Sequence, residues 1–187
     1  RTTTTNFDLH PTVLEGESVN VTAKFFEQTR DAITSSRTVD IEEIRSDPIG
    51  AYDIMAMMQA LPSVVSGSDQ YNEIIVRGGA PGENLFVMDY LEIPYPNHYP
   101  EQGKSGGPIT MVDTEFIERI DFYAGAFPAR YGEKLSSVMD VTLREGNRER
   151  HLGEISMNMA GFGGNVEGPV SDNGSYLFSV KRSFLDF

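Results

Sequence analysis

The stretch IERIDFYAGAFPARYG, residues 117–132, carries the clearest strand-and-loop pattern of the chain. Within it, the segment from Glu118 to Tyr123 places Ile120 and Phe122 on one side by alternation, and Arg119, Asp121 and Tyr123 on the other. This alternation predicts a β-strand with one buried face. The segment that follows, from Ala124 to Gly132, contains glycine and proline and predicts a tight loop.

Short strand patterns and one helix lie around this stretch. The further strands are predicted at residues 73–77, 85–89 and 138–144. A helix is predicted over residues 49–61, because Asp47 can cap it, Pro48 suits its first turn and Pro62 ends it. Helix and strand segments are interspersed without a regular βαβ repeat, so residues 38–148 are predicted to form an α+β domain with a small mixed β-sheet and short helices.

The last part of the chain changes to long alternating segments. Residues 152–168 and 175–187 each carry one apolar face and one mostly polar face, and the turn SDNG at residues 171–174 separates them. We therefore predict a hairpin within residues 149–187. Strands of about ten residues with this alternation are typical of transmembrane β-barrels. An ordinary hairpin on a soluble sheet has the same local pattern, and these two strands alone favour it.

The first part of the chain has a sequence pattern that is typical of extended strands. Residues 1–23 alternate and are interpreted as the end of a preceding β-domain, whereas residues 24–37 show no clean period and are interpreted as a linker. Because the chain starts and ends within such patterns, we expect it to be a piece of a longer protein.

Composition excludes several classes of function. The formal net charge is -13, which argues against a nucleic-acid partner, because such proteins need a basic face to replace the counterions of phosphate. The chain has no cysteine, so disulfides and cysteine-ligated metal sites are excluded. No apolar run approaches the ~20 residues that a membrane-spanning helix needs.

The sequence contains no convincing catalytic site, and we expect no enzyme activity, no cofactor and no bound metal. Its histidines, which are His10, His98 and His151, lie far apart and share no spacing. The run Gly103-Lys104-Ser105 looks like the end of a phosphate-binding loop, but histidine occupies the position of its first glycine. The acidic clusters lack the spacing of an EF-hand.

The stretch at residues 117–132 resembles a hallmark of the plug domains of TonB-dependent outer-membrane receptors. That hallmark is an IERIEV-type strand followed by a glycine-containing turn and a closing Tyr-Gly pair. Four further segments resemble plug motifs in the family's order, namely LPSV at 61–64, IIVRGG at 74–79, FVMDY at 86–90 and SSVMDVTLREG at 136–146. The chain departs from the pattern where Ala124 replaces an arginine before Gly125 and where Tyr90 replaces a glycine.

The resemblance implies the gate of an importer. Members of this family are β-barrels in the bacterial outer membrane, and a plug folded inside the barrel blocks its lumen until TonB pulls on it. The implied partners are TonB, the protein's own β-barrel, an extracellular nutrient ligand and a surface lipoprotein. The hairpin at residues 149–187 would then be the first hairpin of the barrel.

Three groups of residues receive roles from the resemblance. The group expected to contact the barrel wall is Arg77, Arg119 and Arg130. The group expected to face the ligand lies in loop 94–108 and comprises Tyr95, Asn97, His98 and Tyr99. The TonB box is expected at Glu17, Ser18, Val19, Asn20, Val21, Thr22 and Ala23. A plain surface arginine at position 77 and a Pro/Gly-rich loop without a ligand are the simpler alternatives.

Two other functions remain open at this stage. One is a signal-transducing receptor of the same fold, which residues upstream of Arg1 would reveal. The other is a soluble periplasmic or surface binding module, which would not continue into many alternating strands after Phe187.

The TonB box assignment predicts the effect of proline at Val21. The segment is extended and β-prone, so it can add as a strand to the edge of another protein's sheet. Proline removes a backbone donor and fixes φ, so Val21→Pro in the full-length receptor should abolish energised uptake while ligand binding to the cell surface persists. Loss of both would indicate a folding defect instead. Retention of both would place the box elsewhere, as expected if residues 17–23 are only the last strand of the preceding domain.

Overall fold

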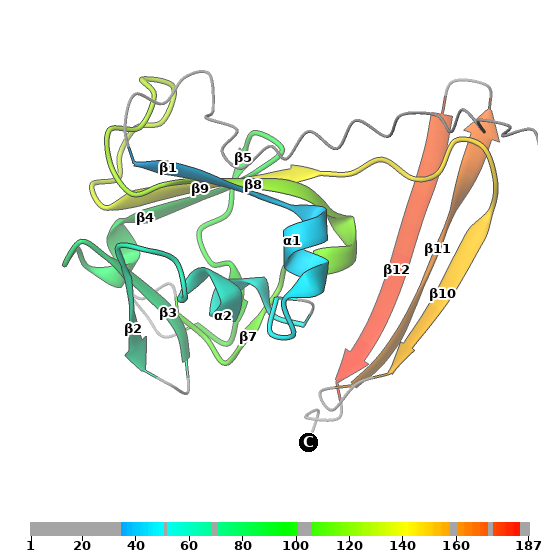
Figure 1. Cartoon of the computed structure of the whole chain (residues 1–187), viewed down its shortest axis with the longest axis horizontal. Helices are drawn as coiled ribbons and strands as arrows, with labels where there is room; N and C mark the ends of the chain where they lie inside the picture. Colours follow the sequence, from blue (N-terminus) through cyan, green and yellow to red (C-terminus); the bar gives the residue numbers. More distant parts are fainter. Residues whose placement is uncertain are drawn as a thin grey trace, which may run out of the picture.

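The structure is a computed structural model, and it describes residues 35–50, 52–68, 71–100, 106–157, 161–171 and 174–183. The TonB box and the β-domain predicted within residues 1–23 lie outside the described residues. The described residues form two parts (Figure 1). The mixed domain runs from β1 (Ser36–Asp40) to β9 (Ser137–Leu143), and the C-terminal sheet runs from β10 (Leu152–Met157) to β12 (Gly174–Ser183).

The mixed domain is built on a five-stranded sheet with the strand order β1-β8-β9-β4-β5. The remaining strands of this sheet are β4 (Asn84–Met88), β5 (Leu91–Glu92) and β8 (Ile117–Tyr123). β4 pairs with β9 in parallel, and the other neighbours are antiparallel. The predicted α+β class with a small mixed sheet is therefore confirmed, and the strands predicted around residues 85–89, 118–123 and 138–144 correspond to β4, β8 and β9.

Both faces of β8 are covered, although its sequence predicted only one buried face. Ile120 and Phe122 pack in the larger hydrophobic cluster, as the alternation predicts. Tyr123 on the opposite face is also fully buried, because Phe127 and Tyr131 from the following loop pack over a second cluster that contains it. The loop after β8 thus closes the face that would otherwise be open.

Smaller elements complete the mixed domain. They are the strands β2 (Val64–Ser68), β3 (Tyr71–Val76), β6 (Asn97–His98) and β7 (Ile109–Thr110), the helices α1 (Ile41–Ser46) and α2 (Ile54–Met58), and the 3-10 turns η1 (Pro81–Glu83) and η2 (Thr114–Phe116). β2 pairs with β3, and β6 pairs with β7. In Figure 1, α1 and α2 lie on the same side of the five-stranded sheet.

The helix predicted over residues 49–61 is shorter than expected. α2 begins after Asp53, whose side chain accepts hydrogen bonds from the backbone of its first turn, whereas the predicted cap Asp47 closes a separate turn at Ile49 and Gly50. Ile54, Met55, Met58 and Leu61, which helical spacing places on one apolar face, are buried. α1 was not predicted as a helix, because six residues with a single buried apolar side chain, Ile44, leave no periodic signal.

Two predicted boundaries need correction. The predicted linker ended at residue 37, but β1 already begins at Ser36 because its backbone pairs with β8. The predicted hairpin within residues 149–187 is a three-stranded antiparallel sheet, in which β11 (Gly161–Ser171) lies between β10 and β12. Residues 152–168 therefore contain two strands, because apolar alternation does not reveal where a chain reverses direction.

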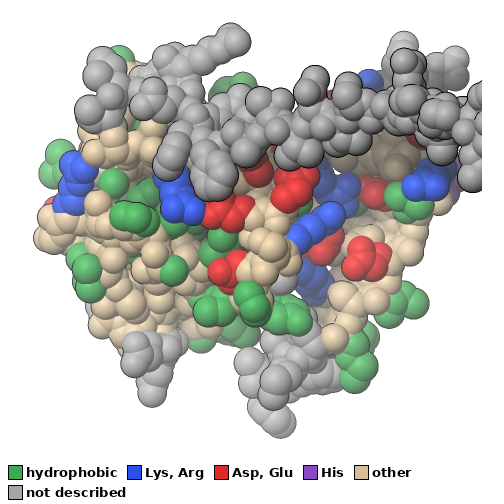
Figure 2. All heavy atoms as spheres, viewed as in Figure 1, with side chains coloured by type: hydrophobic (Ala, Val, Ile, Leu, Met, Phe, Trp, Pro, Cys, Tyr) green, Lys and Arg blue, Asp and Glu red, His purple; other side chains and the backbone are tan. Residues whose placement is uncertain are grey.

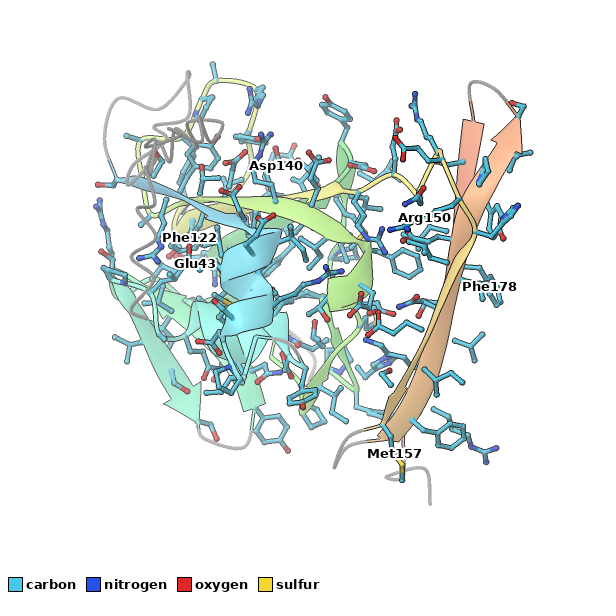
Figure 3. All side chains as sticks on the ribbon, turned by 45° about the vertical axis from the view of Figure 1, so that its right-hand side comes forward. Glu43, Phe122, Asp140, Arg150, Met157 and Phe178 are labelled. Atoms are coloured by element: carbon cyan, nitrogen blue, oxygen red, sulfur yellow. The ribbon has the colours of Figure 1, made fainter. Side chains whose placement is uncertain are left out.

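The two faces of the C-terminal sheet differ in polarity. On one face the apolar side chains are exposed, and they are Ile155, Met157, Phe162, Val166, Tyr176, Phe178 and Val180. Figure 3 shows Phe178 on the side of the sheet that is turned away from the mixed domain. The opposite face carries Glu167, Ser179 and Lys181 and points toward the mixed domain. Among the described residues, no helix is long and apolar enough to cross a membrane.

Candidate functional site

A largely buried ion pair joins the two parts of the molecule. The Nη1 atom of Arg144 lies 2.5 Å from Oε2 of Glu167 on β11, and the two side chains are only 20% and 12% exposed. The Nε atom of Arg144 also donates to the carbonyl of Glu115. Figure 2 shows Arg, Lys, Asp and Glu side chains gathered where the mixed domain faces the C-terminal sheet. The interface is therefore polar, and Arg144 and Glu167 form a charge pair across it.

Asp113 forms the second link to the sheet. One carboxylate oxygen accepts from the Nζ atom of Lys181, and the other accepts from the hydroxyl of Ser179 at 2.7 Å. Asp113 also accepts from the backbone N–H of Glu115 at 3.0 Å and so caps η2.

The sequence reasoning missed Arg144 and Asp113 as contacts between the two parts. Arg144 directly follows β9, and the polar positions that it and Asp113 meet lie on the regular alternation of β11 and β12. A charged residue at the end of a domain's last strand, followed by strands with a charged face, is the sequence pattern that would have indicated these contacts.

The three arginines expected at the barrel wall contact the mixed domain itself. Arg77 donates from Nη2 to the hydroxyl of Ser35 at 2.6 Å, and Arg119 pairs with Asp121 at 3.2 Å. The guanidinium of Arg130 lies 4.7 Å from the ring centroid of Tyr131. Since the described sheet comprises only three strands, their contact with a barrel wall stays a prediction.

The Tyr-Gly pair that closes the hallmark loop returns to the five-stranded sheet. The hydroxyl of Tyr131 donates to the carboxylate of Asp140 on β9. Burial, together with this hydrogen bond, raises the pKa of Tyr131 above its ordinary value. Because the pKa of a phenol in the unfolded chain is about 10, the contribution of this contact to stability is fully present below that pH and is lost as the pH rises through the higher folded pKa.

Most of the residues expected to face the ligand lie on the surface. Tyr95, His98 and Tyr99 are exposed, with Tyr95 at 43% and Tyr99 at 75%. Asn97 is fully buried at 0% exposure, and its amide donates to the carbonyl of Asn72. Asn97 therefore does not reach the surface at which we expected it, because β6 turns its side chain into the protein while its neighbour His98 points out.

A cleft of about 730 Å³ lies between the mixed domain and the C-terminal sheet. His98, Tyr99 and Tyr52 line it from the mixed domain, and Phe162 and Lys181 line it from the sheet. The exposed tip of β6 therefore borders the space between the two parts.

Comparisons with known proteins identify relatives for most of the chain. The family model described as TonB-dependent Receptor Plug Domain matches residues 28–138. The ferrienterobactin receptor of Escherichia coli (strain K12) is 30% identical over 127 residues, which are 61% of this chain and 17% of the receptor.

Solved structures share the fold at low sequence identity. A mutant ferric enterobactin receptor of Pseudomonas aeruginosa, solved in complex with enterobactin, aligns with a TM-score of 0.57 at 19% identity over 79% of this chain and 24% of its own. The alcaligin outer-membrane receptor of Bordetella pertussis aligns with a TM-score of 0.58 at 18% identity over 83% of this chain and 27% of its own. The chain thus spans about a quarter or less of the length of these receptors.

The buried ion pair predicts unequal effects of two similar substitutions. Glu167→Gln removes the charge that faces Arg144 and should weaken the interface by about 1.5–3 kcal/mol, the typical contribution of a hydrogen bond to a charged group. Glu145→Gln is the matched control, because its pair with Arg148 is exposed on both sides and such pairs contribute about 0–1 kcal/mol. Hydrogen exchange of residues 141–150 in the full-length receptor should accelerate only in Glu167→Gln. Equal exchange in both variants would contradict the interface.

Proposed function

Because this chain belongs to the TonB-dependent receptor plug domain family, we propose that the mixed domain is the gate of an outer-membrane transporter. The C-terminal sheet is then the beginning of the barrel wall around that gate. This assigns residues 36–143 to the plug, and it places the wall from residue 152 onward.

The amphipathic C-terminal sheet carries this proposal. Its apolar face is exposed along all three strands, with Ile155 at 92% and Phe178 at 58% exposure. Soluble domains rarely expose contiguous apolar patches of this kind. A barrel wall needs such a face toward lipid and a polar face toward its lumen, where the plug lies. This observation disfavours the alternative of a soluble periplasmic or surface module.

The dimensions of the strands support a membrane wall. β11 has 11 residues and β12 has 10 residues. A tilted transmembrane strand needs about 9–11 residues. β10, β11 and β12 therefore have the form of the first strands of a barrel, and within the described part of the chain no strand pairs with the outer edge of β10 or of β12.

The ligand end of the gate follows from the direction of β10. In Figure 1, β10 runs downward beside the mixed domain, from near the level of β8 to about the level of β7 and the lower ends of β2 and β3. If β10 starts at the periplasmic side, as the first strand after a plug must when the plug is entered from the periplasm, then Tyr95, His98 and Tyr99 face outward. These exposed residues are the part of the surface that we assign to ligand binding.

The substrate class that the relatives favour is an iron–siderophore complex. The curated relative is named for ferrienterobactin, and one structural relative was solved with enterobactin. The proteins that this chain resembles are receptors rather than enzymes. TonB, the protein's own barrel and a surface lipoprotein are the further partners that we propose, and the bacterial outer membrane is the proposed location. A signalling function of the same receptor is the second candidate.

The wall assignment predicts a difference between two neighbouring residues of β11. Val166 lies on the exposed apolar face, whereas Asn165 lies on the opposite face. Val166→Lys places a charge in lipid, which costs about 2–4 kcal/mol near the bilayer midplane. This substitution should therefore lower the amount of folded receptor in the outer membrane. Asn165→Lys should assemble normally. The measurement is the heat-modifiable gel mobility of the full-length receptor, and equal assembly of the two variants would count against lipid contact.

The gate assignment predicts a leak when the mixed domain is removed. Deletion of residues 36–143 from the full-length receptor should leave an open barrel, because the side chains that fill the lumen are gone. Cells with this variant should become sensitive to large antibiotics such as vancomycin and should lose energised uptake of ferric enterobactin, the probe for the siderophore class. An assembled barrel without increased antibiotic sensitivity would show that the mixed domain does not occlude a pore.

A further inference from the structure

The carboxylate of Asp53 connects three elements of the mixed domain. Its Oδ1 atom accepts from the backbone N–H groups of Met55 at 2.9 Å and Ala56 at 3.2 Å, at the start of α2. Its Oδ2 atom accepts from the side-chain amide of Asn72 on β3 and from the backbone N–H of Thr110 on β7 at 3.4 Å. All four groups are donors, so both carboxylate oxygens are used as acceptors.

Both arms of the exposed loop that carries His98 and Tyr99 end on this group of residues. The entering arm is held where the buried amide of Asn97 donates to the carbonyl of Asn72 at 3.3 Å. The returning arm is held where the backbone N–H of Asn72 donates to the carbonyl of Gly107 at 2.8 Å. The backbone of Asn72 is therefore hydrogen-bonded to both arms of the loop, and its side-chain amide is hydrogen-bonded to the carboxylate of Asp53.

The two arms are also joined to each other. The hydroxyl of Thr110 donates to the carbonyl of Pro96 at 3.3 Å, and Thr110 pairs with Asn97 in the β6–β7 ladder. Asn72, Asn97 and Thr110 are all buried, so these hydrogen bonds are shielded from water. The loop is thus fixed at its base while Tyr99 is open to solvent.

We propose that Asp53 is a positioning residue for the ligand-facing surface, which sets the loop of Tyr95, His98 and Tyr99 by holding Asn72 and Thr110. The inference rests on the proposed function for the meaning of that surface. Its physical content is preorganisation, because a loop fixed before binding loses less conformational entropy when the ligand arrives. The exposed aromatic side chains contact the ligand, and the carboxylate of Asp53 fixes the position of the loop that carries them.

Asp47 provides a matched control within the same segment. Its carboxylate accepts from the backbone N–H groups of Ile49 at 2.7 Å and Gly50 at 2.9 Å, which is the same kind of local cap as that of Asp53 on α2. The donors that meet Asp47 come from its own turn, whereas those that meet Asp53 also come from β3 and β7. A comparison of the two aspartates therefore separates local capping from positioning of the loop.

The test measures the mobility of the loop directly. The chain has no cysteine, so Tyr99→Cys in a full-length receptor freed of other cysteines accepts a single nitroxide label. Asp53→Asn replaces one acceptor oxygen by a donor amide, which opposes the N–H groups of Asn72 and Thr110. We expect the EPR spectrum at position 99 to shift from an immobilised to a mobile line shape in Asp53→Asn and to stay unchanged in Asp47→Asn. A label at Tyr90→Cys, in the turn between β4 and β5, should not respond to either substitution.

A second variant separates positioning from a general loss of stability. Asp53→Asn combined with Asn72→Asp exchanges donor and acceptor across the contact, and it should return the label at position 99 toward the immobilised state. An unchanged spectrum in Asp53→Asn would overturn the proposal. So would equal mobilisation in Asp53→Asn and Asp47→Asn, or a change in the spectrum at position 90 in Asp53→Asn, since each indicates a structural effect that is not specific to the loop.

The same receptors distinguish failure of this inference from failure of the proposed function. Uptake and cell-surface binding of ferric enterobactin test the transporter, whereas the EPR line shape tests the loop without a ligand. A mobilised label together with weakened ferric enterobactin binding in Asp53→Asn supports the inference in full. A mobilised label with unchanged binding would confirm the anchor but overturn the assignment of this loop as the ligand-facing surface.

Discussion

The ion pair between Arg144 and Glu167 determines how the two parts of this molecule stand against each other. Arg144 directly follows β9, so its guanidinium lies where the chain leaves the mixed domain, and it also holds the carbonyl of Glu115. A charge this well buried needs a partner, because removing one member leaves the other desolvated. The polar face of the C-terminal sheet must therefore turn inward, and its apolar face consequently turns outward.

Carboxylates recur as organising groups in this acidic chain. Asp53 and Asp113 each cap a short helical element and each reach a strand that is distant in sequence. A carboxylate suits both tasks, since its two oxygens accept several hydrogen bonds at once. The excess of acidic residues thus has structural uses inside the fold, in addition to its effect on the net charge.

The kind of contact between the two parts is suited to a gate. The mixed domain has its own hydrophobic core, which includes Met58 and Ile120, and so it does not depend on the sheet for burial. The described contacts between the parts are instead polar, through Arg144 and Asp113. Paired charges define a geometry strongly but add little net stability compared with apolar packing. A plug held in this way can be both accurately seated and displaced by force.

Local patterns in the sequence were sufficient for the elements that bury a periodic apolar face. The strands β4, β8 and β9 and the buried face of α2 follow from alternation and helical spacing, and the order of short motifs identified the family. Sequence also identified the surface positions His98 and Tyr99, although not the burial of Asn97 between them and Tyr95.

Only the tertiary structure decided which residues meet. Asp113 and Lys181 are 68 residues apart, and Asp53 and Thr110 are 57 residues apart, so no local period relates them. The reversal between β10 and β11 and the second buried face of β8 also depend on partners from elsewhere in the chain. The sequence by itself determined the elements and the family, because these depend on neighbouring side chains. The interface, the anchored loop and the orientation of the sheet required the fold, because hydrogen bonds and ion pairs form only where folding brings distant donors and acceptors together.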